Sequence, residues 1–469
     1  MVAGGCVKMS AVTRIGIIGG GPGGYEAALV AAQLGAEVVL VERDGIGGSA
    51  VLTDCVPSKA LIAVSDVMDE VEDSRSLGVV FDAAVGVDLV RLNSRVQALA
   101  AAQSGDIERH LGADGVRVVH GRGRLEGPRR IVATTEAGEE AVDVDAVLLA
   151  TGAHPRELPE AMPDGERILT WTQLYGLDAL PRRLVVVGSG VTGAEFANAY
   201  ESLGSDVVLV SSRDRVLPGE DADAAAVIEE VFKRRGMTVL SRARAASVSR
   251  SGDGVVVTLT DGSTVEGSHV LMAVGSVPNT AELGLDSAGV ELDERGFVRV
   301  DRVSRTTASG VYAAGDVTGV LMLASVAAMQ GRIAMRHALG DAVAPLDLGV
   351  VSSNVFTDPE IATVGWTQRM VDDGQVQAAS VKLPLSRNAR AKMQDITDGF
   401  VKVFCRPGSG TVMGGVVVAP RASELIHPLS LAVRNGLTAD QVADAFTVYP
   451  SLSGSVAEAA RELRSAHGG

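Results

Sequence analysis

Short apolar runs and an alanine-rich segment follow one another near the start of the chain. RIGIIG, at 14–19, has the length and apolar character of a buried strand, and the alanine-rich stretch from Pro22 to Leu34 predicts a helix. EVVLVE then predicts a second strand that ends at Glu42. This order of elements is that of a β-α-β unit with parallel strands.

The same order of elements occurs a second time further along the chain. LVVVG at 184–188 predicts a strand, AEFANAYESLG at 194–204 predicts a helix, and DVVLVS predicts a strand that ends at Ser211. Two such units predict two nucleotide-binding folds of the Rossmann type in one chain.

The segments between and after these units predict how the two folds are completed. An amphipathic stretch near 87–112 predicts a helix, and VLLATGAHP at 147–155 resembles HVLMAVGSVPN at 269–279. GVYAAGDVTG at 310–319 indicates a strand, a turn and the start of a helix. From about 346 onward, alternating apolar and polar positions predict antiparallel strands.

The predicted fold class is therefore α/β, with two dinucleotide-binding domains and a C-terminal α+β domain whose helices start near Ser423 and Ala439. The predicted boundaries are 1–155 for the first part of the first nucleotide-binding domain, 156–276 for the second nucleotide-binding domain, 277–345 for the second part of the first, and 346–469 for the C-terminal domain.

Composition and charge argue against several classes of function. The 469 residues include 46% hydrophobic residues and 55 glycines, which suits several domains with many strand-to-helix turns. A net charge of −16 and an aromatic content of 3% argue against a nucleic-acid partner. We expect no metal site. We also expect no stable membrane insertion, because no apolar run reaches the roughly 20 residues that a span requires.

Cysteine usage and the N-terminus predict a cytoplasmic protein. Cys6, Cys55 and Cys405 form a sparse, odd set, typical of a reducing compartment. The segment before Arg14 lacks the apolar centre of a signal peptide, and Met9 is an alternative to Met1 as the first residue.

A glycine-rich turn follows the first predicted strand, with the pattern G-x-G-x-x-G formed by Gly19, Gly21 and Gly24. In such a turn the first glycine allows the tight bend, the second lets the backbone approach a pyrophosphate, and the third lets helix and strand pack closely. The helix N-terminus favours the anion, and Glu42 is placed to accept hydrogen bonds from a ribose. The pattern predicts a dinucleotide site; a purely structural turn is the alternative.

The second unit repeats the glycine pattern with Gly188, Gly190 and Gly193. Its second strand ends in Ser211, where an acid would bond a ribose 2′-hydroxyl and repel a 2′-phosphate. Arg213 and Arg215 follow closely, so the segment favours, or at least permits, NADP(H). The alternative is that both arginines are ordinary solvated loop residues.

Two segments carry a specific resemblance to a known family. GGSAVLTDCVPSK, at 47–59, has one cysteine, Cys55, with Ala50 five residues upstream, and VYPSLSGS near the C-terminus has Tyr449 before a proline. Both resemble the active-site segments of the flavoprotein disulfide reductases, which carry a C-x4-C pair in the first and His-Pro followed by an acid in the second. The similarity covers about 14–463, but the first cysteine, the histidine and the acid are replaced.

The resemblance implies FAD in the first fold, NAD(P)H as electron donor in the second, and a homodimer formed through the C-terminal domain. Asp316 matches the aspartate that contacts the ribityl–phosphate arm of the flavin, and 322–325 resembles the next turn at FAD. The residues implied at FAD are Gly19, Gly21, Gly24, Glu42, Gly48, Lys59, Gly123, Thr151, Gly152, Asp316 and Ala324. Those implied at the nicotinamide nucleotide are Gly188, Gly190, Gly193, Ser211, Arg213 and Gly275.

Lys59 matches the family lysine beside the flavin N5 atom, and Glu195 matches the acid that pairs with it. Hydride arrival at N5 leaves negative charge on the flavin, which a nearby ammonium stabilises, and the carboxylate positions that ammonium. The alternative is a structural or surface pair, which contributes little.

Cys55 matches the flavin-proximal cysteine of the family and precedes Pro57, which suits the first turn of a helix. Such a position lowers the pKa of a thiol, so Cys55 is either a thiolate near the flavin or a small inert filler. With Ala50 in the partner position it cannot form the intramolecular disulfide. Tyr449 cannot replace the imidazole base, because a phenol titrates near about 10. It is either a hydrogen-bond donor to substrate or an aromatic residue of the dimer interface.

Electron input is thus kept while the dithiol output is lost. We expect electrons to pass from NAD(P)H to FAD and then directly to a small flat acceptor such as a quinone or a dye. The chain is interpreted as an NAD(P)H:quinone oxidoreductase, similar to the members of the family that lack the dithiol. A soluble pyridine-nucleotide transhydrogenase and a non-enzymatic flavoprotein scaffold are the alternatives.

Overall fold

The computed structural model describes residues 12–467 of the chain. Cys6 and Met9, on which two of the sequence predictions rest, lie outside the described residues. The chain divides into two compact units. The first contains the residues up to Pro57, Gln97–His154 and Ser276–Leu346, and the second contains Ser58–Val96, Pro155–Gly275 and the residues from Asp347 onward.

A five-stranded parallel sheet lies at the centre of the first unit. Its strands are β1 (Arg14–Ile18), β2 (Glu37–Glu42), β3 (Arg117–His120), β7 (Ala146–Leu149) and β18 (Val311–Ala313). They run in the order β18-β7-β1-β2-β3, with β1 between β7 and β2. The central strands are apolar and buried along their length, as expected for a parallel sheet covered on both faces.

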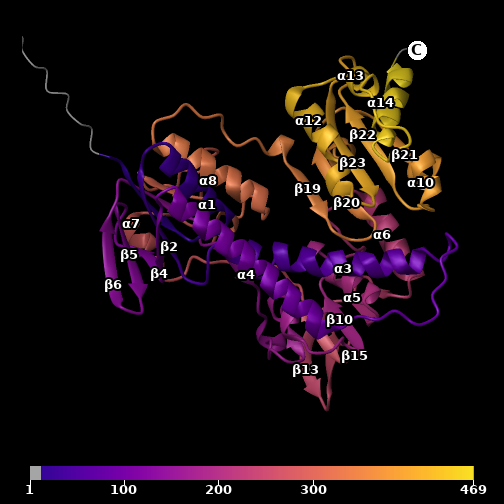
Figure 1. Ribbon diagram of the computed structural model, residues 1–469, viewed down its shortest axis with the longest axis horizontal. Coiled ribbons are helices and arrows are strands. Elements are labelled where there is room, and N and C mark those ends of the chain that lie inside the picture. Colours follow the sequence, from indigo (N-terminus) through magenta and orange to yellow (C-terminus); the bar gives the residue numbers. More distant parts are fainter. Residues whose placement is uncertain (1–11, 468–469) are drawn as a thin grey trace, which may run out of the picture. The chain divides into compact units, whose positions relative to one another are not determined.

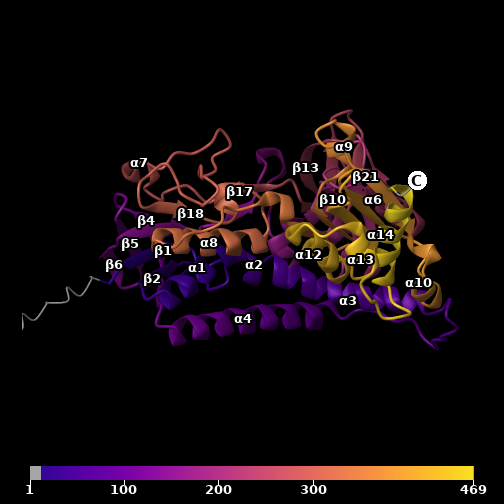
Figure 2. The same ribbon diagram turned by 90° about the horizontal axis from the view of Figure 1, so that it is seen from above.

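Helix α1 (Pro22–Gln33) connects β1 to β2 and packs closely against α8 (Ala324–Ala338), as Figure 2 shows. Glycines permit this approach, because a Cβ at Gly331 would lie 2.1 Å from the carbonyl oxygen of Gly23. The other elements in this part of the chain are α2 (Gly48–Leu52), the antiparallel strands β4 (Arg122–Leu125), β5 (Arg130–Thr135) and β6 (Gly138–Asp143), β8 (Ala153–Pro155), β17 (Ser276–Pro278), α7 (Leu285–Ala288) and the short 3-10 turn Asp316–Thr318.

The second unit contains a second parallel sheet, in the order β12-β11-β10-β16-β9. Its strands are β9 (Ile168–Leu169), β10 (Arg183–Val187), β11 (Asp206–Val210), β12 (Thr238–Leu240) and β16 (His269–Met272). An antiparallel sheet of β13 (Ala245–Ser251), β14 (Gly254–Leu259) and β15 (Thr264–Gly267) lies between β12 and β16 in the sequence.

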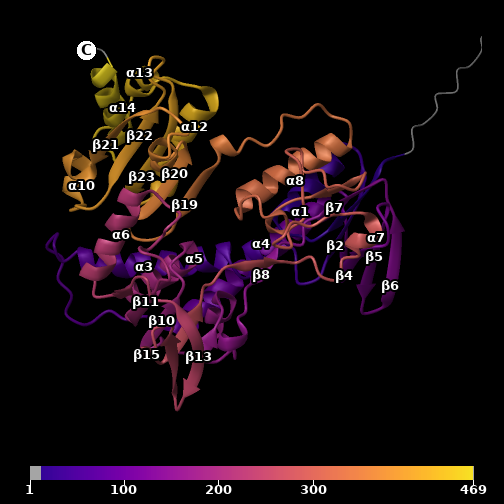
Figure 3. The same ribbon diagram turned by 180° about the vertical axis from the view of Figure 1, so that it is seen from behind.

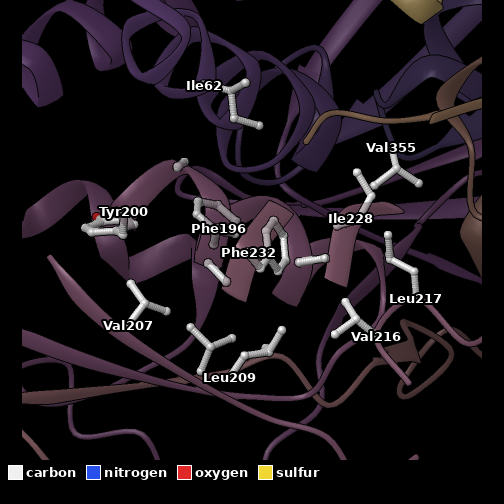
Figure 4. Packing of buried hydrophobic residues seen from close by; sticks show 14 of the residues in the cluster. Ile62, Phe196, Tyr200, Val207, Leu209, Val216, Leu217, Ile228, Phe232 and Val355 are labelled. Carbon is white, nitrogen blue, oxygen red and sulfur yellow. The ribbon is translucent and has the colours of Figure 1, made fainter. Parts of the chain in front are cut away.

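Helix α5 (Val191–Ser202) connects β10 to β11 and is buried on nearly all sides. It lies beside α3 (Cys55–Asp73) in Figure 1, and α6 (Ala222–Arg234) follows β11. Phe196 and Tyr200 of α5 pack with Phe232 and Ile228 of α6 in one apolar cluster (Figure 4). A helix that is buried on all sides is expected to carry few polar residues, so the buried, charged Glu195 is an exception that suggests a function.

The C-terminal part of the second unit is an antiparallel sheet in the order β19-β20-β23-β22-β21. Figure 3 shows α12, α13 and α14 beside these strands. The strands are β19 (Ser352–Val355), β20 (Glu360–Gly365), β21 (Ala379–Pro384), β22 (Phe400–Cys405) and β23 (Val412–Ala419). The helices of this part are α9 (Gln368–Asp372), α10 (Ala389–Met393), α11 (Ala422–Leu425), α12 (His427–Asn435), α13 (Ala439–Ala443) and α14 (Gly454–His467). Helix α4 (Leu89–Ala113) lies earlier in the chain and follows α3.

The α/β fold class and both β-α-β units agree with the sequence prediction, while some boundaries differ and one helix was not predicted. Helix α5 begins at Val191, three residues before the predicted start, because Gly190 already serves as its N-cap. Strand β11 ends at Val210, and the predicted last residue, Ser211, lies just beyond it. The sequence did not predict α14, whose apolar face packs against β21 and β22.

Candidate functional site

The first glycine turn has the backbone shape that a bound dinucleotide requires. Gly19 has a φ of +104°, and a Cβ there would lie 2.3 Å from the carbonyl oxygen of Ala150. A Cβ at Gly24 would lie 1.8 Å from the carbonyl oxygen of Gly19, so a side chain would push α1 away from β1. A Cβ at Gly21 would point into open space, at a helix N-terminus that no side chain of the described residues caps. The turn therefore leaves room and N–H groups for a phosphate.

Backbone N–H groups hold the Glu42 carboxylate, which is buried at the end of β2. The Gly20 N–H donates to its Oε2 atom at 2.5 Å, and the Asp44 N–H donates to its Oε1 atom at 2.7 Å. A Cβ at Gly20 would lie only 3.1 Å from Oε2, so a side chain at this position would crowd the carboxylate. The carboxylate thus lies at the carboxyl end of the sheet, where the sequence predicted a ribose contact.

Asn279, which the sequence did not single out, fixes the turn at Thr151 and Gly152. Thr151 Oγ1 donates to the Asn279 carbonyl at 2.8 Å, and Asn279 Nδ2 donates to the Thr151 carbonyl at 2.7 Å. The Asn279 N–H also donates to the carbonyl of Gly152, which has a φ of +68°. The similarity between the segments that contain these residues was the one sequence signal for this contact.

Asp316 opens a short turn after β18. The preceding Gly315 has a φ of +81°, and its N–H donates to the buried side chain of Gln330 at 2.8 Å. Burial, together with the negative charge of Asp54, raises the pKa of the Asp316 carboxyl to about 6. A carboxyl of this kind is well placed to accept a hydrogen bond from a bound hydroxyl group.

The other residues predicted at FAD also lie in the first unit, apart from Lys59. Gly48 lies against the first turn, since a Cβ there would be 2.9 Å from the Gly21 Cα atom. Gly123 lies in β4 against Ile18, and Ala324 is the exposed first residue of α8. The open face at Gly21, the uncapped helix and the fixed Glu42 carboxylate together fit a dinucleotide such as FAD.

The second glycine turn repeats the geometry of the first. Gly188 has a φ of +113°, and a Cβ there would lie 2.1 Å from the carbonyl oxygen of Ala273. A Cβ at Gly193 would lie 1.9 Å from the carbonyl oxygen of Gly188, and one at Gly190 would point into open space. Gly275, with a φ of +95°, is open in the same way. This turn also fits a nucleotide phosphate.

Ser211 is fully buried, and its hydroxyl group is engaged within the protein. Ser211 Oγ lies 2.7 Å from Ser189 Oγ, and it accepts the N–H of Arg213 at 3.1 Å. The side chain of Arg213 is exposed, whereas a guanidinium nitrogen of Arg215 lies 3.4 Å from the carbonyl oxygen of Pro218. Ser211 thus shapes the turn from within, and the arginines supply its exposed charge.

Lys59 and Glu195 come together as the sequence predicted. Lys59 Nζ, on α3, donates to Glu195 Oε2, on α5, at 2.7 Å, and the Glu195 side chain is only 4% exposed. Phe356, which the sequence missed, completes the group: its N–H donates to Glu195 Oε1 at 2.9 Å, and its ring centroid lies 4.8 Å from Lys59 Nζ. Both oxygens of the buried carboxylate are therefore satisfied, which fixes the position of the ammonium.

Cys55 is the first residue of α3, and Ala50 lies in α2. The link between the two helices is tight, because the N–H groups of Thr53 and Asp54 both donate to the Ser49 carbonyl. Cys55 is partly exposed, whereas Cys405, the other cysteine of the described residues, is buried in β22. The α2–α3 segment thus contains a single thiol at a helix N-terminus.

Tyr449 is 84% exposed, on a loop that follows α13. It lines a hollow of about 370 Å³ in the C-terminal part of the second unit, together with Asn388 and Arg461. Phe446 and Val448 on the same loop are also exposed.

Within residues 12–467, no group of three or more His, Cys, Asp or Glu side chains is arranged to hold a metal ion. No helix in this part of the chain is long and apolar enough to cross a membrane.

Two parts of the chain match the sequence patterns of one protein family. Residues 13–331 match the pyridine nucleotide-disulphide oxidoreductases, and residues 351–460 match the dimerisation domain of the same family. The chain belongs to the pyridine nucleotide-disulphide oxidoreductase family. FAD and NAD(P)H, expected from the sequence, are the cofactor and the electron donor of this family of oxidoreductases.

Several relatives cover nearly the whole chain. A protein of Mycobacterium tuberculosis named NAD(P)H dehydrogenase (quinone) is 57% identical over 96% of this chain and 94% of its own length. Dihydrolipoyl dehydrogenase of Geobacillus stearothermophilus is 32% identical over 95% of this chain and 94% of its own length.

Solved structures agree with the fold. The crystal structure of LpdA from Mycobacterium tuberculosis matches with a TM-score of 0.92 and 56% identity, over 96% of this chain and 100% of the other. The flavoprotein disulfide reductase RclA from Escherichia coli has the same fold, with a TM-score of 0.85 and 24% identity, over 96% of this chain and 99% of the other.

Proposed function

We propose that the protein is an NAD(P)H:quinone oxidoreductase that works without a redox-active disulfide. NAD(P)H and a proton reduce the quinone to the hydroquinone, and NAD(P)⁺ is released. One observation carries the proposal: the α2–α3 segment contains Cys55 but has Ala50 in the partner position, while the partly buried Lys59–Glu195 pair is present. Thiol–disulfide exchange with a disulfide or dithiol substrate requires two thiols on the enzyme, whereas reduction of a quinone requires none.

The relatives support the same reading. The Mycobacterium tuberculosis protein that is 57% identical to this chain is named NAD(P)H dehydrogenase (quinone), whereas the dihydrolipoyl dehydrogenases are only about a third identical. We infer that the quinone activity in that name also applies here.

In this proposal, separate residues bind the two nucleotides and stabilise the transferred charge. FAD, when bound, would supply the two-electron relay between NAD(P)H and the acceptor. The glycine turns at Gly19 and Gly188 bind phosphates at helix N-termini. The Lys59 ammonium, positioned by Glu195, supplies positive charge that favours the arrival of hydride, and Asp316 binds a hydroxyl group of the cofactor.

We also infer a homodimer and a cytoplasmic location. The C-terminal sheet matches the family's dimerisation domain, and the exposed apolar loop with Phe446, Val448 and Tyr449 suits an interface. Sparse cysteines support a reducing compartment.

An acceptor screen of the purified holoenzyme tests the proposed activity, with NADH or NADPH as donor. We expect steady turnover with quinones, and lipoamide or glutathione disulfide turnover lower by at least about a hundredfold, because the resolving thiol and the base are absent. Comparable rates with lipoamide would overturn the proposal. Faster transfer from NADPH to a thio-NAD analogue than to any quinone would identify a transhydrogenase instead, and failure of NAD(P)H to bleach the flavin would indicate a scaffold.

The substitutions Cys55→Ser and Cys55→Ala test whether the thiol lies on the electron path. Because quinone reduction needs no thiol, we expect both variants to keep quinone turnover within about threefold of the parent, or some 0.7 kcal/mol of barrier. Stopped-flow reduction and reoxidation of the flavin measure the two half-reactions separately. A loss above about a hundredfold in both variants, with FAD still bound, would place the thiol on the path.

A further inference from the structure

The turn after β12 is joined to the turn after β11 by backbone hydrogen bonds. The Arg242 N–H donates to the Arg213 carbonyl at 2.7 Å, and the Ala243 N–H donates to the Ser211 carbonyl at 2.8 Å. The Ser211 N–H in turn donates to the Leu240 carbonyl at 2.8 Å. Three bonds within a few residues hold the two turns in a fixed relation at the carboxyl edge of the sheet.

Arg242 adopts a strained backbone conformation at this junction. Its φ of +57° lies in the left-handed region, which is uncommon for residues other than glycine, asparagine and aspartate. Such strain persists where the surrounding structure fixes it, and it is frequent at ligand sites. The position is therefore a candidate for function.

The two turns collect exposed positive charge. Arg213, Arg242 and Arg244 are exposed, and Arg215 is partly so. Within the described residues none of these four forms an ion pair with a carboxylate. By contrast, Arg183 of the same sheet pairs with Asp206. The acidic residue between Arg213 and Arg215, Asp214, is exposed.

The strand end beneath these arginines is uncharged. In the first fold, Glu42 occupies this position, and a side chain on Gly20 beside it would crowd its carboxylate. In the second fold the equivalent residues are Ser211 and Ser189, whose hydroxyl groups are 2.7 Å apart. The Ser189 side chain thus occupies the volume into which a glutamate at position 211 would extend.

We propose that Arg242 and Arg213 together bind the 2′-phosphate of NADPH, and that the Ser189–Ser211 pair keeps the strand end free of a carboxylate that would repel it. A guanidinium group binds a phosphate with two parallel hydrogen bonds, and two such groups from separate turns neutralise its charge. Without a carboxylate, the ribose diol of NADH lacks its usual acceptor. This inference rests on the nicotinamide site of the proposed function and adds Arg242 and Ser189 as determinants of nucleotide choice.

Binding of two probes to the FAD-loaded protein tests the proposal without any acceptor. The probes are 2′-phospho-ADP-ribose and ADP-ribose, which differ only in the phosphate, and calorimetry measures both affinities. The main variant is Arg242→Asn, because asparagine tolerates the left-handed backbone. We expect about a tenfold or greater loss of affinity for 2′-phospho-ADP-ribose and a change within about twofold for ADP-ribose.

Arg244→Ala is the matched control, since Arg244 is exposed two residues further along and bears the same charge. We expect both affinities to stay within about twofold of the parent, because salt screens charge that makes no direct contact. An unchanged ratio of affinities in Arg242→Asn, or an equal loss in Arg244→Ala, would overturn the proposal.

The strand end is tested by exchanging its residue pair for that of the first fold. The double substitution Ser189→Gly/Ser211→Glu should tighten ADP-ribose binding and weaken 2′-phospho-ADP-ribose binding by about tenfold, because it supplies a carboxylate and room for it. A double variant that keeps the parent's preference would overturn this part. These ratios do not depend on quinone turnover, so failure of the quinone activity alone leaves them standing, whereas failure of both probes to bind would remove the nicotinamide site and the proposed function together.

Discussion

The two nucleotide-binding folds of this chain have glycine turns of closely similar geometry. In both, the first glycine has a strongly positive φ, +104° at Gly19 and +113° at Gly188. In both, a Cβ on the third glycine would collide with the carbonyl oxygen of the first, at 1.8 Å for Gly24 and 1.9 Å for Gly193. The glycine pattern therefore sets the backbone and carries no information about which nucleotide binds.

The folds differ where side chains meet behind that backbone. The first fold pairs Gly20 with Glu42, and the second pairs Ser189 with Ser211. Each pair fills a similar space, one with a carboxylate against a backbone N–H and the other with two hydroxyl groups. The residue after the first glycine thus changes together with the strand end, and the two positions are best read as one unit.

A second difference lies on the connecting helices, two residues after the third glycine. Glu26 of α1 pairs with Arg332 at 2.9 Å, and the two side chains are 23% and 44% exposed. Glu195 of α5 pairs with Lys59, and its side chain is 4% exposed. Exposed pairs contribute little, whereas a buried carboxylate that loses its partner is costly. The same position therefore carries a carboxylate nearer the surface in one fold and, in the proposed function, the carboxylate that positions Lys59 in the other.

Substitution of the third glycine should break the two folds separately, and this is the largest effect we expect. In Gly193→Ala the new Cβ has no room beside the Gly188 carbonyl, so α5 must move and its N-terminus no longer faces the phosphate. We expect NADPH affinity to fall by at least about a hundredfold while FAD stays bound. Gly24→Ala should instead lose FAD, which the ratio of flavin to protein absorbance measures.

Tight nucleotide binding in Gly193→Ala would show that the helix N-terminus of the second fold does not face the phosphate. A global loss of folding, seen as a lower Tm with both ligands absent, is controlled by Gly176→Ala. Gly176 lies in the same unit at the end of the short 3-10 helix Trp171–Gly176, its φ is not positive, and a Cβ there would meet only open space.

The sequence could predict those features that depend on neighbouring residues. Both β-α-β units, the glycine turns and the C-terminal antiparallel strands follow from local patterns of apolar residues, and the structure confirms them. Helix α14 was not predicted, because its buried face consists mostly of alanine, which gives only a weak apolar pattern in the sequence.

Contacts between distant residues could be predicted only in part. The Lys59–Glu195 pair was predicted because two motifs carried it, although its residues are 136 positions apart. Phe356 and Arg242 belong to no motif, and backbone hydrogen bonds that most residue types could form hold them in place, whereas Asn279 adds a side-chain hydrogen bond to the Thr151 carbonyl. Such positions become visible only once the fold brings the segments together.

Matched substitutions of the two helix carboxylates should sharpen the contrast between a catalytic and a surface pair. In Lys59→Met or Glu195→Gln the positioned charge is lost, and we expect flavin reduction by NADPH to slow by about ten- to a thousandfold. Glu26→Gln removes the equivalent carboxylate of the first fold and should change the rate by less than about twofold. Stopped-flow absorbance of the flavin measures all three variants.

Unchanged reduction in Lys59→Met, with FAD bound, would show that the buried pair only joins α3 to α5. A loss in Glu26→Gln as large as that in Glu195→Gln would remove the contrast between the two positions.

The smallest expected effect concerns pH and stability, and the group that tests it lies where α3 meets α5. Asp69 of α3 accepts a hydrogen bond from Ser202 of α5 at 2.9 Å and lies 3.3 Å from Arg235. Burial raises the pKa of the Asp69 carboxyl to about 7, although Arg235 opposes the shift, and Asp358 adds negative charge. The pKa of an aspartate in the unfolded state is about 4, so between about pH 4 and 7 the folded state holds more protons than the unfolded state. The free energy of unfolding must therefore fall as the pH rises through this window.

Asp69→Asn removes this dependence, so its Tm should decline less than the parent's between pH 5 and 8, by about one to three degrees. Glu26→Gln, on the half-exposed surface of α1, should follow the parent curve. Parallel pH profiles for the parent and Asp69→Asn in differential scanning calorimetry would show that the folded protein accommodates the ionised carboxylate beside Arg235 at no cost.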